Sequence, residues 1–208
     1  MKTKALLIVL LAAISFSSCQ KEASLQNRGG EKNDKILGTW NFVGMDVDLT
    51  SEITAGSGVD HERMLSHYTY TSTNNKGTLT FDASKSISNN LSHTFNTVVF
   101  FKYFVGGSLI DEFEIPMEGD MPPSNGSVEY KVLSEDSLYF EKGFTILEAP
   151  DGQGAPTTHN TLPTTVGLAW AKDTMILTVD LVQFQEQVIN GLNARVKNDV
   201  RQVIKLKK

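Results

Sequence analysis

Residues 36–43, ILGTWNFV, place their side chains alternately on two faces, and this alternation constrains the fold of the chain more than any other feature. Side chains two residues apart lie on the same face of a β-strand, so Ile36, Trp40 and Phe42 share one face. Gly38 lies on that face too. Its missing side chain leaves room for the Trp40 indole to fold against neighbouring backbone near the closed end of a small barrel. The segment therefore predicts the first strand of a β domain.

The same two-residue period recurs along the chain, and turn-forming stretches such as 74–77 and 106–107 separate the repeats. We find no alternation of strands with helices of the kind that builds parallel sheets. We therefore expect an all-β domain of about 8–10 antiparallel strands, a meander that closes into a β-barrel, with a two-sheet β-sandwich as the alternative. The strands expected after the first are 67–73, 78–82, 92–105, 108–115, 127–133, 137–141, 164–170, 175–181 and 200–206.

Segment 92–105 is apolar on both faces, which predicts that another element covers its outer side. Residues 183–195 are rich in good helix formers, so we expect a short C-terminal helix there that supplies this cover. A hairpin that turns at 190–191 is the alternative. Residues 46–64 and 116–126 show no sustained period and are expected to be loops.

The first 18 residues predict a signal peptide for export. Two lysines precede an apolar run of about ten residues, well short of the roughly 20 residues that a membrane-spanning helix needs. Cys19, the one cysteine of the chain, follows small residues in a pattern that resembles a lipobox, which implies cleavage before Cys19 and its lipidation. Residues 19–33 are polar and predict a flexible tether about 20 Å long, so the β domain is expected to span 34–208.

Residues 38–40 have the form of the GxW motif of lipocalin-like (calycin) barrels. Together with the lipobox, the wording ILGTW resembles the start of lipocalin-like lipoproteins of Bacteroidota. This resemblance implies a lipocalin-like β-barrel that the lipid on Cys19 holds on the outer membrane. Residues 20–22, QKE, resemble a surface-export tag and imply the cell surface, with the periplasmic face as the alternative. In lipocalins an arginine near the C-terminus packs over the motif tryptophan, and Arg195 and Arg201 are the candidates here.

Aromatic side chains on the expected inward face are the candidate ligand contacts. In one interpretation they fill the barrel completely, as side chains can in an eight-stranded barrel. In the other they line a cavity for a small apolar or amphipathic ligand, which tyrosine hydroxyls orient. The sequence leaves both interpretations open. The candidate residues are Trp40, Phe42, Tyr68, Tyr70, Phe81, Phe95, Phe101, Tyr103, Phe113, Tyr130 and Phe140.

We expect no enzymatic activity, cofactor or metal, because we find no activated nucleophile or phosphate-binding loop in the sequence. His61 and His67, the nearest approach to a metal site, are six residues apart and do not match the spacing of ligands on a helix. A net charge of −5 without basic clusters disfavours nucleic acid as a partner. The expected partners are a membrane and a small apolar ligand. Alternatives are an assembly lipoprotein that contacts a protein partner through 92–105, and a glycan-binding accessory protein that uses Trp170 or Tyr139.

Overall fold

The chain folds almost entirely into β-strands. The computed structural model describes residues 33–208 except 57–60, 145–147, 151–155, 159–161 and 190–191. A single 3-10 turn, η1 (Asp34–Ile36), is the only helical element among them. The strands are β1 (Gly38–Ala55), β2 (Glu62–Thr71), β3 (Thr73–Phe81), β4 (Lys85–Val105), β5 (Ser108–Ser134), β6 (Ser137–Phe140), β7 (Glu148–Pro150), β8 (Pro156–Thr158), β9 (Thr164–Ala171), β10 (Thr174–Ile189) and β11 (Leu192–Lys207).

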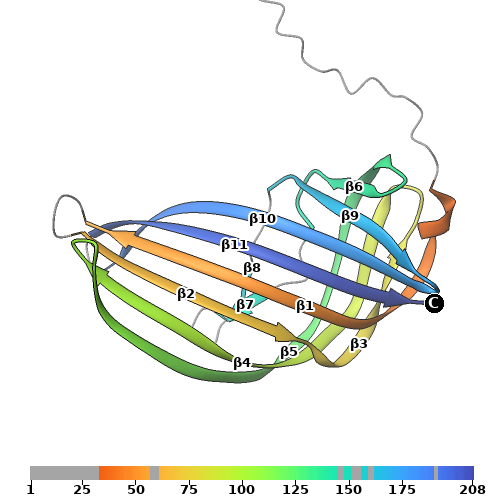
Figure 1. Ribbon diagram of the computed structural model, residues 1–208. Helices are drawn as coiled ribbons and strands as arrows, with labels where there is room; N and C mark the ends of the chain where they lie inside the picture. Colours follow the sequence, from red (N-terminus) through yellow and green to blue (C-terminus); the bar gives the residue numbers. More distant parts are fainter. Residues whose placement is uncertain (1–32, 57–60, 145–147, 151–155, 159–161, 190–191) are drawn as a thin grey trace, which may run out of the picture.

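Nine of these strands form one antiparallel sheet that closes on itself (Figure 1). The order β11-β10-β9-β6-β5-β4-β2-β1 follows the sequence, and β11 pairs with β1 to complete the ring. β2 and β3 together form one interrupted strand, because both pair with β1 and with β4 at successive positions. The predicted antiparallel meander that closes into a barrel is therefore confirmed, and the sandwich alternative is excluded. β7 and β8 pair only with each other.

The ring is complete over only part of its length. β6 pairs with 130–134 of β5, and β9 pairs with 174–179 of β10, so these two short strands join β5 to β10 only there. Among the described residues, β5 up to Glu129 pairs only with β4, and β10 beyond Val179 pairs only with β11. We call the part with β3, β6 and β9 the closed half, and the rest the open half. The long strands β1, β2, β4, β10 and β11 extend from the first into the second (Figure 1).

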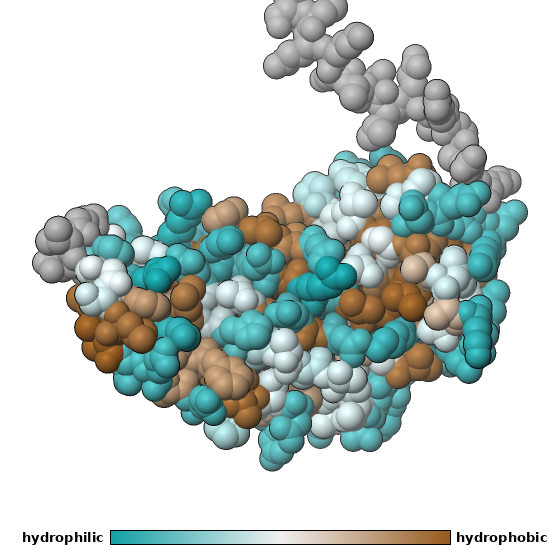
Figure 2. Space-filling model, viewed as in Figure 1, coloured by the Kyte–Doolittle hydropathy of each residue, from teal (hydrophilic) through white to brown (hydrophobic). Residues whose placement is uncertain are grey.

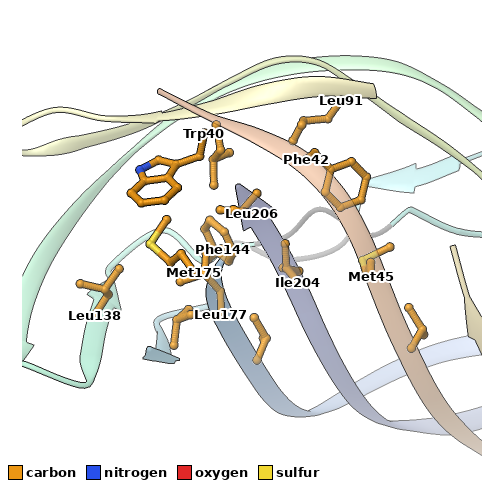
Figure 3. Packing of buried hydrophobic residues seen from close by; sticks show 14 of the residues in the cluster. Trp40, Phe42, Met45, Leu91, Leu138, Phe144, Met175, Leu177, Ile204 and Leu206 are labelled. Carbon is orange, nitrogen blue, oxygen red and sulfur yellow. The ribbon is translucent and has the colours of Figure 1, made fainter. Parts of the chain in front are cut away.

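The core of the domain fills the closed half (Figure 3). Trp40 lies at its centre, where its indole Nε1 donates a hydrogen bond to the carbonyl oxygen of Ile36 over 2.7 Å. Ile36 is itself fully buried, so the η1 turn covers this end of the barrel. Burial of so many large apolar groups is the main force that stabilises the fold. Around Trp40 pack Leu79, Phe81, Leu138, Phe140, Met175, Leu177, Ile204 and Leu206.

The expected C-terminal helix is wrong. Residues 183–189 belong to β10 and pair residue by residue with β11, from Gln183 opposite Asn198 to Ile189 opposite Leu192. Side-chain alternation and the ladder of hydrogen bonds to β11 outweigh helix propensity, which is a weak preference. The two strands form the hairpin that was the alternative, and its turn residues 190–191 lie outside the described part of the chain.

Two further expectations are corrected. Residues 46–55 and 62–64 are strand rather than loop, and 116–126 lie within β5. The outer side of β4 is not covered as expected either: the side chain of Phe100, which points outward, is 48% exposed. Phe104 lies further along the same face. The guanidinium of Arg63 lies 4.2 Å from the centroid of its ring and covers it in part.

Candidate functional site

The inner face of the open half places a row of uncharged polar and aromatic side chains across six strands. Each residue of the row is the register partner of the next, so all six lie at one level of the barrel. The polar members come from four neighbouring strands and the aromatic members from the remaining two. In order from β10 to β5, the row consists of Gln183, Asn198, Ser51, Ser66, Phe101 and Phe113.

The aromatic end of this row is accessible from solvent. The rings of Phe101 and Phe113 stack with centroids 4.9 Å apart and planes 13° apart. Phe113 is 41% exposed although it points inward, and its inward-facing neighbour Ile115 is 43% exposed. Both belong to the stretch of β5 that has a strand partner on one side only. Met117, next on the same face, is half-buried and packs against the core. The pair of phenylalanines therefore forms an apolar surface that a ligand can reach.

Three stacked rings lie next to this row, on the side nearer the closed half. Tyr68 stacks on Tyr70 with centroids 6.2 Å apart, and Tyr70 stacks on His93 at 6.1 Å. The hydroxyl of Tyr70 lies 3.4 Å from Nε2 of His93, whereas the buried Tyr68 hydroxyl has no hydrogen-bond partner. Burial raises the pKa of Tyr68 to about 12 and also raises the pKa of Tyr70. Burial lowers the pKa of His93, so all three groups are neutral at neutral pH.

Gln202 is the most unusual buried side chain of the barrel. It lies on the inner face of β11 between Val47 of β1 and Val179 of β10, at the level where β9 stops pairing with β10. Its side chain is 0% exposed, and neither the amide nitrogen nor the amide oxygen has a hydrogen-bond partner. An unsatisfied buried amide costs about 1–3 kcal/mol. Most buried polar groups of native proteins have a hydrogen-bond partner, so this amide is a candidate contact for a bound molecule.

Most charged side chains of the long strands lie on the outer face, and Glu62 and Asp111, at the far end of the open half, are the exceptions. Nζ of Lys205 lies 2.6 Å from Oδ2 of Asp46, and its hydrogen bond lowers the pKa of that carboxyl group. Lys102 pairs with Glu112 over 2.9 Å. These pairs are half-exposed, so each contributes about 1 kcal/mol or less to stability. For the site this means that the charges of these pairs lie on the outer face and not on the inner face.

The chain matches no family model, no curated protein and no solved structure.

The sequence-predicted ligand contacts divide between the two halves of the barrel. Five of them, Trp40, Phe42, Phe81, Tyr130 and Phe140, are buried in the packed core, where side chains fill the interior. Tyr68, Tyr70 and Phe95 are buried next to the open half. Phe101 and Tyr103 are half-buried and Phe113 is exposed, all on the inner face of the open half.

The pattern of aromatic residues does not identify the polar side chains of this face. Gln202 lies in phase with Val200 and Ile204, which a strand pattern places inside the barrel. Gln183 is likewise in phase with the inward-facing residues of β10. A glutamine at an inward-facing position of a strand whose other inward-facing residues are apolar is therefore the sequence signal for Gln183 and Gln202.

The cation over the motif tryptophan is not the expected arginine. Nζ of Lys208 lies 4.7 Å from the ring centroid of Trp40. Arg195 stacks on Phe184 at 4.6 Å, and Arg201 pairs with Asp180 over 3.4 Å, both on the outer face. Lys208, which directly follows β11, thus lies over the face of the Trp40 ring.

Other candidate sites are less well formed. Among the described residues no three His, Cys, Asp or Glu side chains cluster as metal ligands, and His67 pairs with Asp48 over 3.0 Å. Trp170 packs on Trp40 with centroids 5.6 Å apart, so it is no free platform for a sugar, and Tyr139 is half-buried. No helix in the described part of the chain is long and apolar enough to cross a membrane.

Proposed function

We propose that the chain is a lipid-anchored, lipocalin-like protein that binds a small apolar or amphipathic ligand and has no enzymatic activity. The observation that supports this most is the accessible inner face of the open half. There the stacked Phe101 and Phe113 adjoin a row of neutral polar groups. Ligand sites are typically apolar with a few well-placed polar groups, which is the composition of this face. The ligand lies in the open half in this proposal, because side chains fill the closed half.

The ligand proposal is tested by comparing two phenylalanines that lie on opposite faces of the sheet. Phe113→Ala should weaken the binding of a neutral hydrophobic probe such as Nile red about tenfold, because about 1.4 kcal/mol of apolar contact is lost. Phe100→Ala removes a ring of similar exposure from the outer face and should leave the affinity unchanged. Fluorescence titration of the purified domain measures both. Equal affinities of the two variants, or no binding by the wild-type domain, would reject the proposal.

The proposed anchor is a lipid on Cys19, joined to the domain by the tether 19–33. The described chain starts beside the closed half, where the Asn33 amide donates a hydrogen bond to the carbonyl oxygen of Glu135 over 3.1 Å. We propose the outer membrane as the location, with the cell surface as the favoured side and the periplasmic face as the alternative.

Cys19→Ala should release the protein from the membrane. When the full chain is expressed in a diderm bacterium, the wild type is expected in the membrane pellet and the variant in the soluble fraction, because one thioether-linked lipid is lost. Ser17→Ala, which keeps a small residue before the cysteine, is the control and should remain in the pellet. Membrane retention of Cys19→Ala in the same fractionation contradicts the anchor.

A protein-binding role in assembly is the second candidate, and apolar residues on the outer face of β10 favour it. Phe184 and Val188 are 55% and 68% exposed, and they border a concavity of about 630 Å³ together with Arg195 and Lys197. Figure 2 shows apolar side chains at the far end of the open half as well. Light scattering separates the candidates: an oligomer that Phe184→Ser dissociates would favour assembly.

A further inference from the structure

Polar groups on the inner face of the open half are uncharged except at its far end, while most charged groups on the same strands point outward. The neutral inner groups belong to Gln183, Asn198, Ser51, Ser66 and Tyr68. Glu62 and Asp111 are in phase with the inner face. They lie at its rim, at the end of the open half that is farther from the closed half, and are exposed. The outward-facing charged residues include Asp46, Asp48, Glu52, Arg63, Lys102, Glu112, Glu114, Glu118, Asp120, Asp180, Glu186, Arg195, Lys197, Asp199, Arg201 and Lys205.

Two of the inner polar groups lack partners where the open half meets the closed half. The Gln202 amide offers one donor group and one acceptor, and the Tyr68 hydroxyl offers both functions on one oxygen. They come from β11 and β2, the two strands that flank β1. Gln202 is opposite Val47 and Tyr68 is opposite Leu49, so the two groups are one inward-facing position apart along the barrel. Both groups are shielded from solvent, so a head group that both donates and accepts can pair with them once the side chains that cover them move aside.

We infer that the ligand of this barrel carries a neutral hydrogen-bonding head group, such as a hydroxyl, ester or amide, which binds the Gln202 amide and the Tyr68 hydroxyl. This inference rests on the proposed function and names its ligand class. The apolar part of the ligand lies along Ile115 and the Phe101–Phe113 pair, toward the open side of the barrel.

A charged head group does not fit the same position. Burial of an ion is costly unless an opposite charge or several hydrogen bonds compensate it. The described inner face offers no lysine or arginine to a carboxylate or phosphate, and no carboxylate to an ammonium group short of the rim. His93 is held neutral by its burial and already contacts the Tyr70 hydroxyl. The position beside Gln202 and Tyr68 therefore selects against both anionic and cationic head groups.

Displacement of Nile red by three lipids of equal chain length tests the inference. We expect 1-monooleoylglycerol to bind the purified domain at least tenfold more tightly than oleate or oleylammonium at pH 8. Gln202→Leu and Tyr68→Phe should each lower the affinity for 1-monooleoylglycerol about tenfold and leave the affinity for Nile red unchanged. Gln202→Leu replaces an unsatisfied amide by an apolar group of similar size, so the variant is expected to remain folded. Asn41→Leu, which removes an exposed amide from the outer face of β1, is the control and should bind as the wild type does.

The outcomes separate this inference from the proposed function. If Nile red and all three lipids bind equally well, or if Gln202→Leu and Tyr68→Phe keep the wild-type affinity for 1-monooleoylglycerol, the neutral head group is wrong and the binding function stands. If neither Nile red nor any lipid binds, both are wrong. Tight binding of oleate with no dependence on Gln202 would assign the amide to a buried water instead.

Discussion

Trp40→Ala is expected to lower the free energy of unfolding by about 4 kcal/mol, as large-to-small substitutions of buried aromatic residues do. Trp40 is 3% exposed, and its indole contacts Trp170 and the core of the closed half. The substitution leaves a cavity there and removes the hydrogen bond to the Ile36 carbonyl, which holds η1 over this end of the barrel. Such a loss is a large fraction of the 5–15 kcal/mol typical of whole domains. Urea denaturation followed by the fluorescence of Trp170 measures it.

Trp40→Phe separates the two contributions. It keeps an aromatic ring in the site, removes the Nε1–Ile36 hydrogen bond and leaves a smaller cavity than alanine does, so we expect a loss of about 1–2 kcal/mol. A loss below 1 kcal/mol for Trp40→Ala would mean that the tryptophan does not organise the closed half.

Gly77→Ala should destabilise the domain by about 3 kcal/mol or more, because two costs act together. Gly77 has φ +95°, a conformation that an alanine adopts only with strain. An added Cβ would also meet the backbone of β4, against the carbonyl group of Asn90 and 2.6 Å from the carbonyl oxygen of Asn89. Backbone cannot move aside as a flexible side chain can, so β3 would separate from β4.

Gly107→Ala is the matched control for this prediction. Its φ is +82°, but a Cβ there has no atom within 4 Å, so only the strain of about 1–2 kcal/mol remains. Thermal denaturation of both variants should therefore give a clearly larger loss for Gly77→Ala. Equal losses would show that the close approach of β3 and β4 at Gly77 is unimportant for stability.

The two-residue period predicted most of the barrel, because each strand buries one face and exposes the other. It placed Trp40, Phe81 and Phe140 on inward positions correctly. It failed where non-local pairing overrides local preference. Residues 183–195 favour a helix by composition, yet pairing with β11 makes them strand.

Segment 116–126 contains Pro116, Pro122 and Pro123, which suggested a loop. It is nevertheless part of β5, because a strand with one unpaired edge tolerates residues that lack a backbone N–H. The extent of β5 and of its free edge depends on the lengths of β6 and β9, and local sequence patterns do not encode that relation.

The candidate site was predictable only in part. Inward-facing aromatic residues were identified correctly, but periodicity gives no position along the barrel axis. It could not separate Phe140, which is packed into the closed half, from Phe113, which is accessible in the open half. That difference arises from which strands have two partners at each level. The inward phase of Gln202 on its strand marks it as a buried amide, a signal that aromatic residues alone do not provide.

Methyl NMR of the domain labelled at methionine tests the central claim most directly. Met64 and Met117 lie on the inner face of the open half, whereas Met175 is fully buried in the closed half. Titration with 1-monooleoylglycerol should shift the methyl signals of Met64 and Met117 and leave that of Met175 in place. Shifts of Met175 alone, or no shift at any of the three at saturating lipid, would contradict a ligand on the inner face of the open half.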